Sequence, residues 1–119
     1  MADLAEMARQ LGQALSRTDE YQTLRRAISA ADDDREIQEL TSRLQELEER
    51  VHGALERGVK PDAQLEQEYD GVVNKLQASS TYQRLVASQA NFDRIVQRVN
   101  LTIQKGLEEG GQSRIIIPG

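Results

Sequence analysis

The sequence contains no cysteine and no tryptophan, and it has only two prolines, one phenylalanine and three tyrosines. Without cysteine the chain can form no disulfide, thiolate nucleophile or cysteine-ligated cluster, so nothing in it indicates an oxidising compartment. The scarcity of proline favours long helices over a turn-rich β fold. Because aromatic side chains usually supply the largest buried areas, a chain of 119 residues with so few of them predicts a thin core.

Long apolar runs and a surplus of basic residues are also missing. The opening "MADLAEMARQ" has no basic segment followed by an apolar core, and no apolar run approaches membrane-spanning length. The net charge of −5 argues against a nucleic-acid binder, whose affinity comes mostly from neutralising phosphates. We therefore expect a cytoplasmic protein that has no membrane partner and no direct nucleic-acid partner.

The spacing of apolar residues predicts an all-α fold of four to five helices. A first helix covers about 3–15, and its large apolar residues follow one face. They are Leu4, Met7, Leu11 and Leu15. In the following "SRTDE", both Ser16 and Thr18 are candidate N-caps of a second helix, which ends near "AADDD".

The region 33–57 gives the clearest helical signal, because its apolar residues alternate spacings of three and four, as in a coiled coil. They are Ile37, Leu40, Leu44, Leu47, Val51 and Ala54. Gly58 and Pro61 end this helix, and Asp62 can cap the next one. A short loop between two long helices predicts a long antiparallel helical hairpin.

One short pattern occurs twice, as "EYQTLRRA" at 20–27 and as "TYQRLVAS" at 81–88. Tyrosine and leucine three positions apart lie on one helical face, so each copy is interpreted as a first turn anchored against the bundle. In the second copy, Ser80 and Gln83 have the spacing of a capping box, and a continuous helix through 79 and 80 is the alternative. From there an apolar face continues along a last helix to about Lys105. Gly110 and Gly111 are interpreted as a hinge between this helix and the tail.

The two long apolar stripes exceed what one thin bundle can cover, so we predict an oligomeric bundle in which the chain pairs with itself, at least as a dimer. The residues predicted for an oligomer or partner interface are Ile37, Leu40, Leu44, Leu47, Val51, Tyr82, Leu85, Phe92, Ile95 and Val99. Residues 32–57 carry a net charge of −5, and residues 81–105 carry +3. These opposite charges either help to select the pairing or are two ordinary solvated faces.

Candidate catalytic and metal-ligating groups are few. Adjacent positions of the triplet 32–34 point about 100° apart on a helix and do not converge on a metal ion. Asp33 and Glu36 have the spacing of a capping box, so helix initiation is favoured over metal binding. His52 is the only histidine and has no partner for a metal or catalytic constellation. We therefore expect no catalytic residues, no metal and no cofactor, and no enzyme.

The stretches "LGQALSRTDEYQTLRRA" and "SSTYQRLVASQANFDRIVQRVN", on either side of an acidic hairpin, together resemble the YlbF/YmcA family of small bacterial helical regulatory proteins, including its YheA-like members. The resemblance covers about residues 3–105. It implies an all-α, often oligomeric protein without catalytic activity. It also implies a role in a complex that regulates competence, sporulation and biofilm formation and that influences mRNA processing by an endoribonuclease. Iron–sulfur clusters are associated with that complex, but this chain has no cysteine to ligate one.

Residues and resemblance together predict a single helical domain at 1–107 and a flexible C-terminal tail at 108–119. The expected function is that of a non-enzymatic regulatory adaptor, which associates with itself through amphipathic helices and docks unidentified protein partners. The alternative is a structural or chaperone-like coiled helical hairpin that holds other chains on its helical faces.

The tail contains Ile115, Ile116 and Ile117, three β-branched residues in a row that are poorly suited to a freely solvated end. We predict that they dock on the protein's own oligomer, the alternative being a passive, disordered terminus. Deleting residues 112–119 should then lower oligomer stability or partner recovery and leave helicity intact, as measured by thermal melting, light scattering and pull-down. A truncated protein that matches the full chain in all three would show that the tail is passive.

Overall fold

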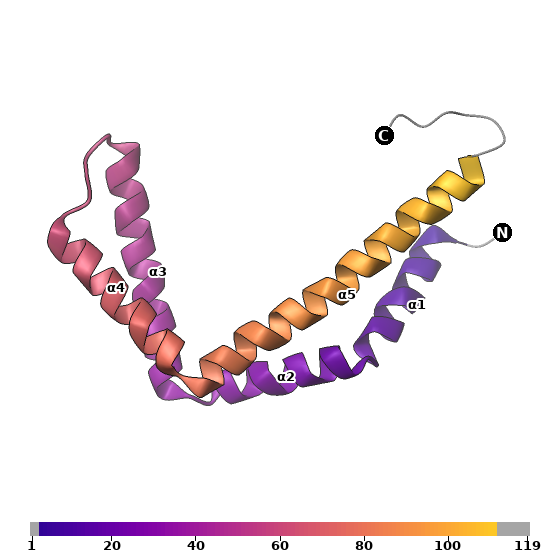
Figure 1. Ribbon diagram of the computed structural model, residues 1–119, viewed down its shortest axis with the longest axis horizontal. Helices are drawn as coiled ribbons and strands as arrows, with labels where there is room; N and C mark the ends of the chain where they lie inside the picture. The colour runs from indigo at the N-terminus through magenta and orange to yellow at the C-terminus, as the bar shows by residue number, and fades with distance from the viewer. Residues whose placement is uncertain (1–2, 112–119) are drawn as a thin grey trace.

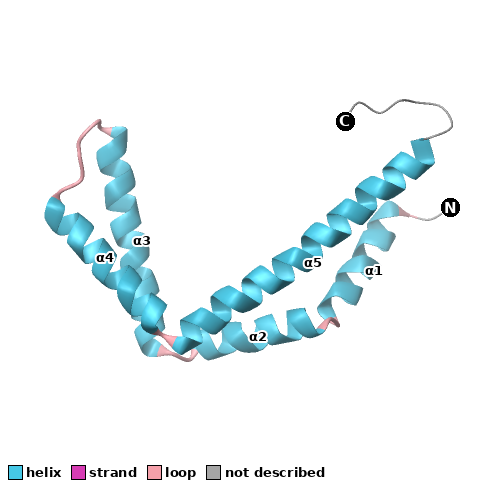
Figure 2. Ribbon diagram, viewed as in Figure 1, coloured by secondary structure: helices cyan, strands magenta, loops and turns pink. Residues whose placement is uncertain are grey.

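The structure, a computed structural model, describes residues 3–111 and has the shape of an open V (Figure 1). Its helices are α1 (Leu4–Ser16), α2 (Asp19–Asp32), α3 (Arg35–Glu56), α4 (Ala63–Ala78) and α5 (Ser80–Gly111). The described part of the chain contains no strand (Figure 2), which confirms the predicted all-α class. One arm of the V consists of α3 and α4. In the other arm α2 packs along the first part of α5, and α1 lies at the outer end.

The antiparallel hairpin of α3 and α4 has the predicted position and the predicted turn. Gly58 adopts a φ of 70°, a left-handed conformation in which glycine is unstrained. The Gly58 N–H donates to the Leu55 carbonyl at 3.0 Å, and the Val59 N–H donates to the Ala54 carbonyl at 2.8 Å. These two bonds form a Schellman motif and satisfy the last carbonyls of α3. The Asp62 side chain then accepts a hydrogen bond from the Gln64 N–H and caps α4, as predicted.

Three helix junctions share one arrangement of side chains. At each junction the N-cap side chain accepts a hydrogen bond from the N–H three residues later, and a glutamine one residue further donates to a carbonyl near the end of the preceding helix. The cap bonds join Thr18 to Tyr21 at 3.1 Å, Asp34 to Ile37 at 3.1 Å and Ser79 to Tyr82 at 3.2 Å. The glutamine bonds run from Gln22 to Ser16 at 2.9 Å, from Gln38 to Ala31 at 3.0 Å and from Gln83 to Gln77. Polar groups of both helices are thereby satisfied at one point.

The repeated Tyr-Gln pattern is therefore part of a junction, between α1 and α2 in its first copy and between α4 and α5 in its second. Thr18 is one of the two caps predicted for α2, but the predictions for the other two junctions are wrong by one residue. Asp34 and Ser79, with ψ angles of 105° and 122°, have the extended backbone that lets a cap side chain reach the first turn. Asp33 instead has a helical backbone at the end of α2, and Ser80 is already the first residue of α5.

The hydrophobic core is thin, as the composition predicts. The buried hydrophobic residues are Leu24, Ala31, Ile37, Leu47, Ala54 and Leu76. Between α2 and α5, the Tyr21 and Phe92 rings meet at a centroid distance of 5.2 Å and a tilt of 55°. A compact domain of this length has a radius of gyration of about 13.5 Å. The radius of gyration of this chain is 20.9 Å, so a large share of its surface lies outside any core.

The last helix is longer than the sequence indicates. The prediction ends it near Lys105 and places a hinge at Gly110 and Gly111, whereas α5 continues through both glycines. The isoleucines predicted to dock, at 115–117, lie outside the described residues. The domain boundary between 107 and 108 stays a prediction.

The cap at the junction of α4 and α5 can be tested with two neighbouring serines. Ser79→Ala removes the acceptor of the Tyr82 N–H and should lower the free energy of unfolding by about 1 kcal/mol. Ser80→Ala, one residue later, is the matched control and should change it by only a few tenths of that amount. Urea unfolding followed by circular dichroism measures both, and equal losses would contradict the assignment of the cap.

Candidate interaction surfaces

The helix α1 carries an apolar stripe that the described chain does not cover. None of its 13 residues is buried, although its large apolar side chains share one face. Leu4 is 81% exposed, Met7 52% and Leu11 38%. An amphipathic helix normally gains its stability by burying this face, so the exposed stripe of α1 is a candidate contact surface.

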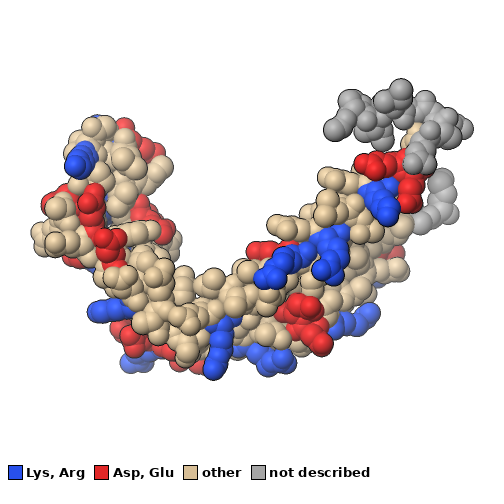
Figure 3. Space-filling view, in the orientation of Figure 1, with Lys and Arg blue, Asp and Glu red and all other residues tan. Residues whose placement is uncertain are grey.

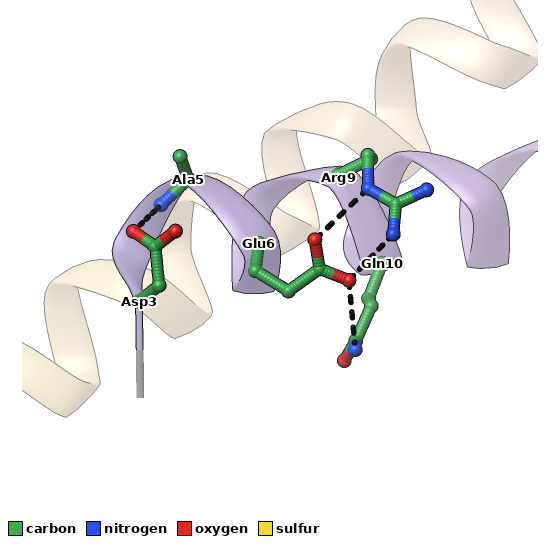
Figure 4. A network of polar contacts seen from close by, with 5 residues as sticks. All are labelled: Asp3, Ala5, Glu6, Arg9 and Gln10. Carbon is green, nitrogen blue, oxygen red and sulfur yellow. Dashed lines mark hydrogen bonds and ion pairs between the residues drawn. The ribbon is translucent and has the colours of Figure 1, made fainter. Parts of the chain in front are cut away.

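The opposite face of α1 satisfies its own polar groups (Figure 4). The Asp3 carboxylate caps the helix by accepting from the Ala5 N–H at 3.1 Å. Arg9 donates to Glu6 from Nε at 3.0 Å and from Nη2 at 2.6 Å, and Gln10 donates to the same carboxylate at 3.3 Å. The hydrogen bond from Arg9 lowers the pKa of Glu6 below its ordinary value. The polar face therefore stabilises α1 locally, whereas the rest of residues 3–111 leaves its apolar face exposed.

The C-terminal part of α5 adds exposed apolar side chains at the same end of the molecule. Figure 1 draws α1 along this part of α5, at the outer end of the longer arm. Ile103 is 50% exposed and Leu107 64%. We call the exposed apolar residues at this end, Leu4, Met7, Leu11, Ile103 and Leu107, the end patch.

The structure leaves most of the residues that were predicted for an interface half-buried in the single chain. On α3, Ile37 and Leu47 are buried, and Leu40, Leu44 and Val51 are half-buried beside α4. On α5, the predicted residues Tyr82, Leu85, Phe92, Ile95 and Val99 are all half-buried. Their role between subunits stays a prediction. The sequence-based prediction did not assign the residues of the end patch to an interface, although the apolar spacing along α1 was visible in the sequence.

The hairpin of α3 and α4 bears a groove of about 500 Å³ near its loop. Val51, Leu55, Pro61 and Tyr69 contribute apolar surface, and three carboxylates and a histidine complete the lining: Glu48, Glu66, Asp70 and His52. We call this site the hairpin groove. His52 lies on the surface, as predicted, where its Nε2 is 2.9 Å from Glu56 Oε1.

An ion pair joins the two helices of the hairpin. Arg43 on α3 donates to Glu68 on α4 and to Glu46 on its own helix, the latter at 3.0 Å. The hydrogen bonds from Arg43 to Glu68 and then to Glu46 raise the pKa of the guanidinium. Because arginine is charged throughout the physiological range, the charge of Arg43 does not limit this contact between the two helices there.

Charge is distributed unequally between the two arms (Figure 3). Residues 33–78, which form the hairpin arm, hold twelve acidic and six basic side chains and so carry a net charge of −6. On the other arm, basic groups gather along α5 toward the inside of the V. Arg94, Arg98, Leu101 and Lys105 recur at spacings of four, three and four along α5, and we call them the basic stripe. Leu101, between the cations, is 65% exposed.

The acidic triplet at 32–34 serves the helix ends. Asp34 caps α3, and Asp33 ends α2. Within residues 3–111, no three side chains of histidine, cysteine, aspartate or glutamate are grouped so that they could hold a metal ion. In the same range, no helix combines the length and the apolarity needed to cross a lipid bilayer.

A comparison with models of protein families gives a match over most of this chain. A family model described as "Control of competence regulator ComK, YlbF/YmcA" matches residues 4–108. The chain belongs to this family. The resemblance seen in the sequence is thereby confirmed, and the description links the family to control of the regulator ComK.

A solved structure extends the comparison to the fold. A protein of unknown function (DUF964) from Bacillus stearothermophilus is similar to this chain with a TM-score of 0.68 and a sequence identity of 23%. The similarity covers 94% of this chain and 98% of the other. At this identity it shows that the two proteins share a fold. No curated protein matches the sequence.

The effects of two leucine-to-alanine changes on α3 can test which side of the hairpin is its core. Leu47 is fully buried, so Leu47→Ala should lower the free energy of unfolding by about 2–5 kcal/mol. Leu55 is 62% exposed at the hairpin groove, and Leu55→Ala should cost less than about 1 kcal/mol. Urea denaturation of both variants at one protein concentration checks the difference. A larger loss for Leu55→Ala would contradict the placement of the core.

Proposed function

We propose that this protein is a non-enzymatic regulatory adaptor, which associates with itself through exposed apolar helix faces and docks other proteins. The observation that carries this proposal is the end patch. It consists of large apolar side chains at least 38% exposed, on the two helices that lie at one end of the molecule. Covering such a side chain completely stabilises an assembly by about 1.5–3 kcal/mol relative to leaving it in water.

The shape of the chain supports association over a solitary monomer. Its accessible surface is 9535 Å². A compact protein of 13.4 kDa has about 6,500 Å². The excess is larger than the total area that a standard protein–protein interface buries, about 1,600 Å². A second subunit on the open arms is therefore the simplest way to complete the thin core.

The regulatory part of the proposal rests on the family description, which names control of the competence regulator ComK. An extended helical surface with separate acidic and basic regions is suited to holding protein partners, because charge complementarity selects the partner and its orientation. Pull-down from the native host, with the intact protein as bait, tests this part. Recovery of a defined set of regulatory partners supports it.

The alternative, a chaperone-like hairpin, is favoured by one observation. Leu55 and Val59 at the loop of the hairpin are 62% and 54% exposed, as on a surface that holds unfolded chains. Recovery of many unrelated unfolded clients in the same pull-down, together with suppression of their aggregation, would support this alternative against the adaptor.

Self-association should depend on the apolar face of α1. Light scattering of the wild-type protein is expected to give at least twice the mass of 13.4 kDa. Met7→Glu with Leu11→Glu places two charges on the exposed stripe, so the mass should fall toward that of one chain while the helical circular dichroism signal is retained.

The matched control is Ala5→Glu with Gln13→Glu, which adds the same two charges on the opposite face of α1. This control should associate like the wild type. Two results would contradict the proposal: a wild-type monomer at high micromolar concentration, or an unchanged mass for the variant of Met7 and Leu11.

A further inference from the structure

We propose that the basic stripe of α5 docks in the hairpin groove of a second copy of this chain. The inference rests on the proposed self-association and names two surfaces that meet in it. Both surfaces are exposed in the single chain, and their charges are opposite.

The basic stripe has the form of a helical ligand. Arg94, Arg98, Leu101 and Lys105 cover three turns on one face of α5, a length of about 16 Å. Leu101 is 65% exposed and is the apolar residue between the cations. Arg94 donates a hydrogen bond to Asn91 at 2.8 Å on its own helix. No ion pair within residues 3–111 engages Arg94, Arg98 or Lys105.

The hairpin groove has the form of a receptor for such a helix. Val51, Leu55 and Tyr69 provide apolar surface for a side chain the size of leucine, in a volume of about 500 Å³. Carboxylates come from both helices, Glu48 on α3 and Glu66 and Asp70 on α4. An amphipathic helix that lays its apolar residue into a groove while its cations meet carboxylates is a recurring mode of recognition. Three cations on the stripe thus face three carboxylates.

The stripe cannot reach the groove of its own chain. The hairpin arm meets α5 through α4 at the base of the V, and from there the arms diverge (Figure 1). The groove lies near the loop of the hairpin, at one tip, and the stripe lies on the outer half of α5 in the other arm. A second copy can offer its groove to the stripe of the first copy and its stripe to the groove of the first copy. Two chains related by a twofold axis therefore make the contact twice.

Charge also selects this pairing over the alternatives. Two basic stripes repel each other, and so do two hairpin arms of net charge −6. The pairing of stripe with groove brings unlike charges together and leaves Leu101 covered. The contact should therefore weaken as salt screens the charges, since the Debye length falls to about 3 Å at 1 M.

The test reverses the charges on one surface at a time. Arg98→Glu with Lys105→Glu makes the stripe acidic, and Glu48→Lys with Asp70→Lys makes the groove basic. Each variant alone should associate with a dissociation constant raised by on the order of tenfold at low salt, because like charges now meet. A 1:1 mixture should regain wild-type affinity, because each variant then offers the surface that the other requires.

Overall charge cannot explain the whole pattern. The wild-type charge of −5 becomes −9 in the first variant and −1 in the second, so net repulsion alone would strengthen self-association of the second variant, whereas the contact predicts that this self-association weakens. The matched control, Arg25→Glu with Arg35→Glu, also carries −9 but changes exposed residues outside both surfaces. This control should associate like the wild type. Mixing it with the variant of Glu48 and Asp70 should not raise the affinity.

The outcomes separate this inference from the proposed function. A wild type that stays monomeric at high micromolar concentration overturns both. A wild type that associates, with two variants that associate equally well, overturns the contact between stripe and groove and leaves self-association standing. Weaker association of each variant, with no recovery of affinity in the 1:1 mixture, also overturns the contact.

Because the natural chain has no cysteine, the contact can also be trapped directly. Leu55→Cys marks the groove and Leu101→Cys marks the stripe, each in a chain of its own. A disulfide requires Cα atoms within about 7 Å, so oxidation of the mixture should link the two variants faster than either links to itself. Gln13→Cys on α1 is the control partner for Leu55→Cys. Linkage to Gln13→Cys as fast as to Leu101→Cys would overturn the contact.

Discussion

The course of the chain depends on how each helix end satisfies its backbone polar groups while the next helix begins. At three junctions an N-cap side chain binds the first turn of the new helix, and a glutamine amide binds a carbonyl of the old one. A cap alone would allow the new helix to leave in many directions. The added glutamine bond ties the two helices at a second point and so restricts the angle between them. With few aromatic residues to form a core, these local bonds determine much of the shape.

The lengths of the helices explain why one end of the molecule is left open. The 32 residues of α5 span about 48 Å, and the 14 residues of α2 span about 21 Å. The Tyr21 and Phe92 rings mark where α2 covers α5, but the outer half of α5 extends beyond that cover. Within residues 3–111, no helix packs on this outer part of α5 as α2 packs on the first part, and α1, drawn at the same end in Figure 1, buries none of its own residues. The end patch thus follows from the unequal lengths of α2 and α5.

Much of the fold could be predicted from the sequence, because helix caps and apolar periodicity are local signals. Gly58 and Asp62 act where the sequence placed them, and Thr18 is one of the two caps that the sequence offered for α2. The errors of one residue at Asp33 and Ser80 arose because an identical residue stands next to each, at Asp34 and Ser79. Only the backbone angle decides which of two identical neighbours is the cap. The extension of α5 through Gly110 and Gly111 was missed because glycine usually indicates the end of a helix.

The candidate surfaces were harder to predict, because periodicity shows which face of a helix is apolar and not what covers it. The stripe at 37–54 resembles a seam between chains, yet its own hairpin already buries Ile37 and Leu47. The stripe of α1 has the same kind of spacing and remains exposed. The hairpin groove combines residues from 48 to 70 that become neighbours only when the hairpin closes.

The unequal distribution of charge is consistent with the open shape. If the arms closed on each other, the acidic hairpin and the basic stripe would meet within one chain and neutralise both surfaces. The junction between α4 and α5 prevents this, since Ser79 and Gln83 direct α5 away from the hairpin. Each arm therefore keeps a charged surface that is exposed in the single chain, and the bonds at one junction maintain both the V and this exposure.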